Sequence, residues 1–144
     1  MCNQIDISAQ TSELKHVRKF VQSYLNDLSI QGATKGQIIL AIDEICANLI
    51  IHSNQKNSEK SIKLSLSYDQ RSSELQVHIK DHGKIFDYSS YQEPIISQVI
   101  ESKQKGGIGL YLVRKIMDKI DFLSEGGLNI TTLTKKINPS TIVS

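Results

Sequence analysis

One stretch decides the fold, Ala41-Ile-Asp-Glu-Ile-Cys-Ala-Asn-Leu-Ile-Ile-His52. Its apolar residues recur three or four positions apart from Ile38 onward, which is typical of a helix that faces a core. A second row is polar, with Glu44, Asn48 and His52 four residues apart. Four residues are close to one helical turn, so these side chains share one face. We predict a core helix that carries a site along one edge. A plain helix edge with an intrahelical hydrogen bond is the alternative.

The composition is that of one globular domain, and we treat residues 1–144 as a single unit. Hydrophobic residues make up 39% of the chain and charged residues 22%, which excludes the disordered class. The net charge of +2 gives no reason to expect direct nucleic-acid binding or a membrane surface. Short apolar runs and a polar N-terminus predict neither a membrane span nor a signal peptide. Two cysteines at no metal-binding spacing favour a reduced, cytoplasmic setting.

The pattern around the central helix predicts an α+β domain. Alternating apolar and polar residues indicate strands at 4–9, 62–68, 75–79, 120–123 and 130–137. Amphipathic periodicity indicates helices at about 13–28, 34–52 and 110–120. Thr11 or Ser12 is the expected cap of the first helix and Thr34 of the second. This order favours a two-layer α/β sandwich, with a mainly antiparallel mixed sheet and helices on one face.

Two further motifs lie at element ends. Asp81-His-Gly83 follows a predicted strand, where an ionised carboxylate can accept from the exocyclic amine of adenine and a glycine allows close approach. A simple turn is the alternative. Lys105-Gly-Gly-Ile-Gly-Leu110 opens a predicted helix, whose bare N–H groups favour phosphates. It is neither a P-loop nor a dinucleotide fingerprint, and a flexible hinge is its alternative.

The three motifs together resemble the ATP site of the GHKL superfamily, which includes gyrase, Hsp90, histidine kinases and MutL. Their order is Glu-x-x-x-Asn-x-x-x-His, then Asp-x-Gly, then Gly-Gly-x-Gly-Leu. Within the superfamily the chain is most similar to the small anti-sigma-factor serine/threonine kinases, over nearly its whole length. The resemblance implies the Bergerat-type ATP-binding fold, with ATP and Mg²⁺ as cofactors.

The resemblance also implies roles for the residues of the first two motifs. Glu44 would be the general base toward a serine hydroxyl, Asn48 the Mg²⁺ ligand, and His52 a neighbour of the phosphates. Asp81 would accept from the adenine amine, and Gly83 would let the base approach.

The glycine-rich motif would wrap the phosphates, and the segment 88–105 would form a lid over ATP. The residues of this motif are Lys105, Gly106, Gly107, Ile108, Gly109 and Leu110. The chain departs from the family pattern at Ile85, where a second glycine is common, and on the last strand. There Thr131 or Thr132 is the adenine-side threonine, and we place Thr131 in the predicted site.

The implied function is an ATP-dependent protein serine/threonine kinase and anti-sigma factor of a partner-switching system. It would phosphorylate a serine of an anti-sigma antagonist protein, sequester a sigma factor or similar target, and form a homodimer. One alternative is a catalytically weak ATP-binding module that holds a partner without phosphoryl transfer. Another is a histidine-kinase-type ATPase domain, and a third is an α+β fold with no nucleotide site.

Overall fold

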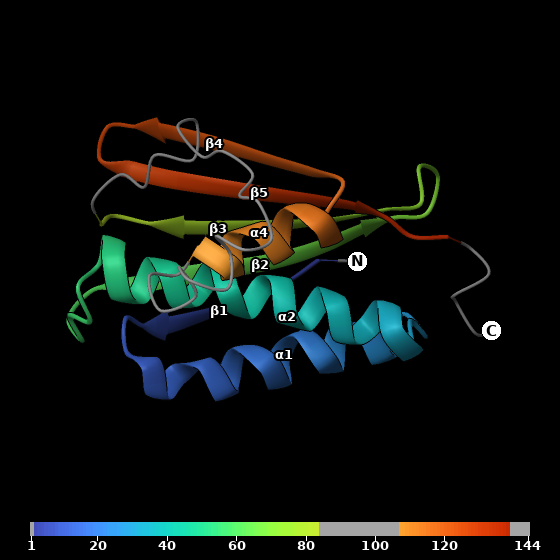
Figure 1. Cartoon of the computed structure of the whole chain (residues 1–144), viewed down its shortest axis with the longest axis horizontal. Coiled ribbons are helices and arrows are strands. Elements are labelled where there is room, and N and C mark those ends of the chain that lie inside the picture. The colour runs from blue at the N-terminus through green and yellow to red at the C-terminus, as the bar shows by residue number, and fades with distance from the viewer. Residues whose placement is uncertain (1, 84–106, 139–144) are drawn as a thin grey trace.

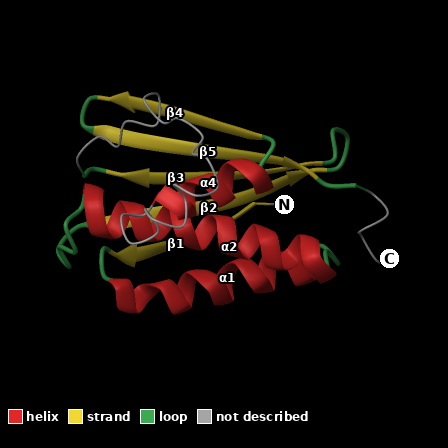
Figure 2. Cartoon of the chain, in the orientation of Figure 1, coloured by secondary structure: helices red, strands yellow, loops and turns green. Residues whose placement is uncertain are grey.

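The computed structural model describes residues 2–83 and 107–138. Its five strands form one sheet in the order β1-β2-β3-β5-β4, and all four pairings are antiparallel. The strands are β1 (Cys2–Ser8), β2 (Ser61–Asp69), β3 (Glu74–Asp81), β4 (Lys119–Glu125) and β5 (Leu128–Lys136). The helices form a layer on one face of this sheet (Figures 1 and 2). The predicted two-layer α+β architecture is therefore confirmed.

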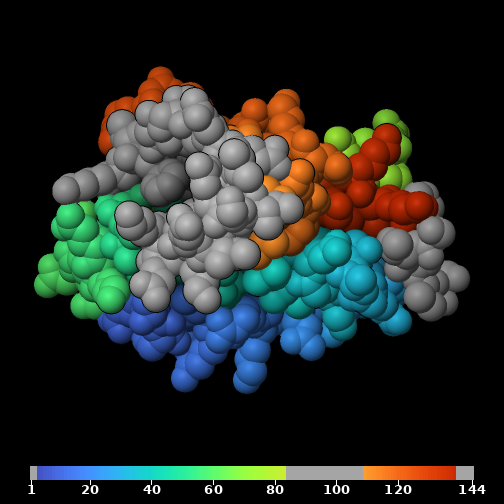
Figure 3. Space-filling model, viewed as in Figure 1, coloured from blue at the N-terminus to red at the C-terminus, as the bar shows by residue number. Residues whose placement is uncertain are grey.

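The helical elements differ from the predicted ones mainly at their ends. They are η1 (Thr11–Glu13), α1 (Leu14–Asp27), α2 (Gly32–Asn48), the π-helical turn η2 (Leu49–Ser53) and α4 (Gly107–Ile116). In the space-filling view, α1 and α2 occupy the lower part of the visible face (Figure 3).

The core lies between the sheet and α2. Alternate residues of β2 and β3 point inward, so that Leu64 and Ile79 are fully buried while the neighbouring lysines are exposed. From the helical side, Ile38, Ile42 and Ile45 are fully buried, as the three-to-four periodicity predicts. The whole apolar row of the central helix thus serves the core, which fixes α2 against the middle of the sheet.

The predicted helix caps are wrong. Thr11 and Ser12 lie in the short 3₁₀ turn η1, and the N-cap of α1 is Glu13 without a side-chain capping bond. The second helix begins at Gly32, two residues before Thr34. Gly32 has φ +69°, a left-handed conformation that glycine adopts without steric cost, and this lets the chain enter the helix early.

The central helix changes its winding before it ends. After Asn48 it continues as η2, in which the backbone N–H of Asn54 donates to the carbonyl of Leu49, five residues earlier, at 2.9 Å. Single π-turns within α-helices are frequent at functional sites. His52 lies within this π-turn, and its side chain is exposed.

The stretch Gly32–Ser53 has the length and hydropathy of a helix able to cross a membrane. Half of it is buried inside the fold, where one side packs on the sheet. Core helices of globular domains share these properties, so the stretch is explained by its packing.

The last helix begins and ends earlier than predicted. It spans Gly107–Ile116, and the backbone N–H of Asp118 already donates to Thr134 of β5 at 2.9 Å. Ile120, predicted in both the helix and the following strand, belongs to β4. Sheet pairing therefore overrides the helical periodicity that continues through Met117 and Ile120.

Candidate functional site

The structure brings the three motifs together at one end of the helical layer. Gly109 in the first turn of α4 lies against Glu44 of α2, and a Cβ atom at Gly109 would collide with Glu44 Oε2. Gly83, just beyond β3, lies against the end of η2, and a Cβ atom there would collide with the backbone carbonyl of Ser53. Gly83 is thus required by close packing against a backbone carbonyl, apart from any contact with a ligand, whereas a side chain at Gly109 would displace the end of the Glu44 side chain.

Asp81 ends β3 as a buried carboxylate with one oxygen occupied and one free. Its side chain is 1% exposed. Oδ2 accepts from Asn54 Nδ2 at 3.1 Å and from the backbone N–H of Gly83 at 3.0 Å. Oδ1 is buried and has no hydrogen-bond partner. A buried carboxylate oxygen without a donor is costly, which marks a place where a ligand or water donates.

Thr131 of β5 repeats this feature on the neighbouring strand. It pairs with Ile79 in the antiparallel register, two residues from Asp81, so its side chain shares the inner face of the sheet. It is fully buried, and Oγ1 has no hydrogen-bond partner. The buried polar atoms without a partner among the described residues are Ser53 Oγ, Asn54 Oδ1, Asp81 Oδ1 and Thr131 Oγ1. An acceptor beside a hydroxyl fits the edge of an adenine ring, whose amine donates and whose ring nitrogens accept.

Alternation along β5 separates the two candidate threonines. Thr132 points to the opposite face of the sheet, where its hydroxyl lies 3.1 Å from His78 Nδ1. Of the two, Thr131 therefore lies on the side of Asp81 and the helices. Asn129, which pairs with Asp81, reinforces this end of the sheet because its Nδ2 donates to the carbonyl of Gly83 at 2.9 Å.

The other end of the candidate site lies along α2. Glu44 is partly buried, and burial, with the neighbouring charge of Asp43 as a smaller cause, raises the pKa of its carboxyl group. Asn48 is 8% exposed and lies one turn further along. His52, in η2, is exposed. Glu44 and Asn48 thus form a partly buried polar edge of α2, and His52 follows in the π-turn as an exposed side chain.

No group of three or more acidic, histidine or cysteine side chains suitable for a metal occurs in the described part of the chain. Mg²⁺ characteristically takes only one or two protein ligands and completes its shell with phosphates and water. The donor set of Asn48 with the nearby carboxylate of Glu44 fits such an ion as part of a nucleotide complex, and does not fit a dedicated protein cage.

The glycine-rich motif falls only partly within the described residues. Lys105, Gly106, the lid segment 88–105 and Ile85 lie outside them, and Gly107 and Ile108 are placed as the first turn of α4 without their side-chain surroundings. Leu110 is 4% exposed and belongs to the core, so a ligand could meet only its backbone.

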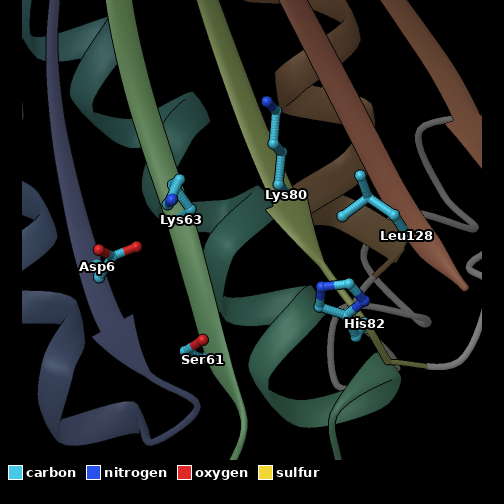
Figure 4. Close-up of a pocket in the computed structure, with 6 residues that line it drawn as sticks. All are labelled: Asp6, Ser61, Lys63, Lys80, His82 and Leu128. Carbon is cyan, nitrogen blue, oxygen red and sulfur yellow. The ribbon is translucent and has the colours of Figure 1, made fainter.

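The helix-free face of the sheet carries a separate hollow of about 600 Å³ (Figure 4). It is lined by Asp6, Ser61, Lys63, Lys80, His82 and Leu128. Side chains alternate along β3, so Lys80 and His82 face this hollow while Asp81 between them faces the helices. None of the predicted site residues lines it, and its charges are mixed.

Sequence reasoning missed Asn54, whose side chain donates a hydrogen bond to the buried carboxylate of Asp81. The polar run 53–60 has the composition of a loop, which by itself predicts no tertiary contact for Asn54. The available signal was an amide residue directly after an apolar helix, a position where Asn often bonds to nearby backbone. Its bond to Asp81, 27 residues away, is a tertiary contact that spacing does not reveal.

Comparison with known proteins agrees with this geometry. Residues 7–135 match the family described as histidine kinase-like ATPase domain. The chain belongs to this family. The match includes α2, the end of β3, α4 and Thr131, so every described part of the candidate site lies within the family domain.

Curated relatives of this ATPase-domain family include protein kinases. The chain is 30% identical to the serine-protein kinase RsbW of Bacillus subtilis over 69% of this chain and 62% of that protein. It is 26% identical to RsbW of Halalkalibacterium halodurans, over 92% of this chain and 81% of the relative. It is 29% identical to the serine/threonine-protein kinase BtrW of Bordetella bronchiseptica, over 71% of this chain and 70% of that protein. The chain thus spans somewhat less than two thirds of the Bacillus subtilis protein.

Solved structures share the fold. The RsbU and RsbW domains of Rv1364c from Mycobacterium tuberculosis align over 100% of this chain and 35% of that one, with a TM-score of 0.69 and 16% identity. The histidine kinase domain of a blue-light activated kinase from Erythrobacter litoralis aligns over 94% of this chain and 64% of that one, with a TM-score of 0.57 and 16% identity. At these identities the likeness concerns the arrangement of the helices and the sheet.

Proposed function

We propose that this chain is an ATP-dependent protein serine/threonine kinase that also acts as an anti-sigma factor in a partner-switching system. The observation that carries the proposal is the free, buried oxygen of Asp81 at the same end of the fold as Glu44. The names of the curated relatives, serine-protein kinase RsbW and serine/threonine-protein kinase BtrW, support the same activity.

The adenine end would bind the nucleotide base. Asp81 Oδ1 would accept from the exocyclic amine, and the Thr131 hydroxyl would meet the polar edge of the ring. The apolar side chains that surround them would exclude water and strengthen these bonds. Gly83 keeps the turn beyond Asp81 close to η2, which holds the carboxylate at the floor of the site.

The phosphate end would combine Asn48 with the first turn of α4. Asn48 would hold Mg²⁺ through its amide oxygen. Backbone N–H groups of the glycine-rich turn around Gly107 and Gly109 would meet phosphate oxygens at the helix N-terminus. When bound, Mg²⁺ supplies charge neutralisation on the phosphates.

Glu44 would act as the general base. It would accept the proton of the partner's serine hydroxyl as that oxygen attacks the terminal phosphoryl group. Burial raises the pKa of this carboxyl group, which makes its ionised form a better proton acceptor than an exposed glutamate. Gly109 leaves room for the carboxylate at this position.

The partners are also proposals. The substrate would be a serine of a small anti-sigma antagonist protein, and the sequestered target a sigma factor or a similar regulator. We propose a homodimer in the cytoplasm, with a role in transcription regulation and no direct contact with nucleic acid or membrane.

The test is incubation of the purified chain with Mg²⁺, γ-labelled ATP and an antagonist-type protein encoded near its gene. We expect label on a serine of that protein. ATP binding without transfer to any such protein would favour the binding module. Transfer to a histidine would favour the histidine-kinase alternative. Absence of ATP binding would overturn the proposal altogether.

A further inference from the structure

Asn54 occupies an unusual position for an amide side chain. It follows η2 directly, is completely buried, and uses both N–H groups of its Nδ2. One donates to the carbonyl of Leu49 at 2.8 Å, and the other to Asp81 Oδ2 at 3.1 Å. A single side chain thus connects the end of the central helix with the end of β3.

This arrangement decides which oxygen of Asp81 remains free. Oδ2 receives two donors, Asn54 Nδ2 and the backbone N–H of Gly83, while Oδ1 receives none. The terminal torsion of an aspartate is broad and soft, so a carboxylate held by one donor could rotate. Two donors on the same oxygen hold the plane of the group and keep Oδ1 available.

We propose that Asn54 is a positioning residue that sets the preference of the site for a purine bearing an exocyclic amine. It does so by holding Asp81 with Oδ1 free to accept from that amine. The inference rests on the proposed ATP binding and adds to it a residue that determines base selectivity.

A purely structural role makes a different prediction. The bond from Asn54 Nδ2 gives the carbonyl of Leu49 a second donor beside the backbone N–H of Asn54, which any buried amide there could do for stability alone. Loss of such a bond would weaken binding of every nucleotide equally, because it would loosen the fold around the site. Loss of a positioning bond would weaken binding of the aminated purine selectively.

The experiment compares two nucleotides by calorimetry, ATP and purine riboside triphosphate, which lacks only the exocyclic amine. A hydrogen bond to a charged acceptor contributes roughly 1.5–3 kcal/mol, so the wild type should prefer ATP by about 10- to 150-fold. In Asn54→Leu, which keeps the shape but has no donor, we expect this preference to fall to less than about a third of the wild-type value. Ser53→Ala is the matched control. It changes the adjacent buried polar residue, which makes no bond to Asp81, and should keep the wild-type preference.

An unchanged preference in Asn54→Leu, with both affinities lowered alike, would overturn the proposal. If the leucine variant does not fold, Asn54→Asp replaces it. That variant sets two carboxylates side by side at neutral pH, so we expect the preference to fall there and to recover at acidic pH, when a shared proton restores a donor. An unchanged preference at both pH values would overturn the proposal equally. Wild-type binding of both nucleotides with equal affinity would refute the selectivity while leaving ATP binding intact, whereas no binding of either would refute the proposed function itself.

Discussion

The two ends of the candidate site are built in different ways. The adenine end lies inside the fold, where Asp81 is 1% exposed and Thr131 is fully buried. The phosphate end lies on the edge of α2, where Glu44 is partly buried and His52 is exposed. One end is defined by buried polar atoms that lack partners, the other by a row of side chains along a helix.

This difference separates recognition from chemistry. Buried atoms such as Asp81 Oδ1 are already desolvated and held in place, so a base that donates to them gains a strong and selective bond. The carboxylate of Glu44 must instead meet a hydroxyl brought by another protein, which requires access from solvent. We therefore expect changes at the adenine end to alter binding, and changes on α2 to alter transfer.

The largest effect is expected at Glu44. Glu44→Gln removes the general base, and we expect phosphoryl transfer to fall by roughly 10²- to 10⁴-fold, with ATP affinity within about twofold of the wild type. The control is Asp43→Asn, which breaks the exposed ion pair with Arg18 and should leave transfer nearly unchanged. Radiolabel transfer and calorimetry measure the two quantities. Normal transfer in Glu44→Gln would show that another group is the base.

Two glycine-to-alanine substitutions test the close packing of η2 against the turn that follows β3. Gly83→Ala places a methyl group against the Ser53 carbonyl, and we expect the free energy of unfolding to fall by about 1–3 kcal/mol. Gly36→Ala adds a methyl group within α2 where nothing lies nearby, and should raise stability by about 0.5–1 kcal/mol. Denaturant unfolding compares them. Equal effects would mean that the approach of η2 to Gly83 is not as close as the structure has it.

The adenine end is tested by adjacent threonines. Thr131→Val removes a buried hydroxyl that has no partner, so we expect unchanged or higher stability and a loss of ATP affinity of about fivefold, equivalent to roughly 1 kcal/mol. Thr132→Val removes the contact with His78 on the opposite face and should leave ATP affinity as it is. The same loss of affinity in both variants would argue against recognition by one face of β5.

The smallest effect concerns pH. Because burial raises the pKa of Glu44 above its ordinary value of 4.5, transfer should decline on acidification at a higher pH than for an exposed glutamate. Asp43 adds to this shift, so Asp43→Asn should move the decline of phosphoryl transfer to lower pH.

The same shift in the pKa of Glu44 affects stability. The folded state binds the proton of this carboxyl group more tightly than the unfolded state, so Glu44 favours folding at acidic pH and loses that contribution as pH rises through its raised pKa. Glu44→Gln should therefore have a Tm no lower than the wild type at neutral pH.

The sequence predicts much of the fold because its periodicities are strong. The apolar row of the central helix and the alternation in β2 and β3 identify the elements and the face that each buries. The residues at which helices begin and end were less predictable. The start at Gly32 depends on a left-handed backbone conformation, and the end of α4 depends on pairing with β5.

For the site, spacing predicted a polar row whose last member lies in a different type of helical turn. Glu44 and Asn48 lie on α2, whereas His52 lies in the π-turn that follows, and a four-residue repeat does not encode this change of winding. The choice of Thr131 required the register of β5 against β3. The bond from Asn54 to Asp81 could not be predicted from spacing, since it joins two elements far apart in the chain.

The most direct measurement of the central claim is the calorimetric ATP affinity of Asp81→Asn. This variant keeps the shape of the side chain and can still accept from Asn54 and Gly83 through its remaining oxygen, which turns an amide nitrogen toward the free position. A donor would then face the donor of the adenine amine, and we predict at least a tenfold loss of affinity, or about 1.4 kcal/mol, in a protein that remains folded. Wild-type affinity in a folded Asp81→Asn variant would contradict the claim that this carboxylate recognises the nucleotide base.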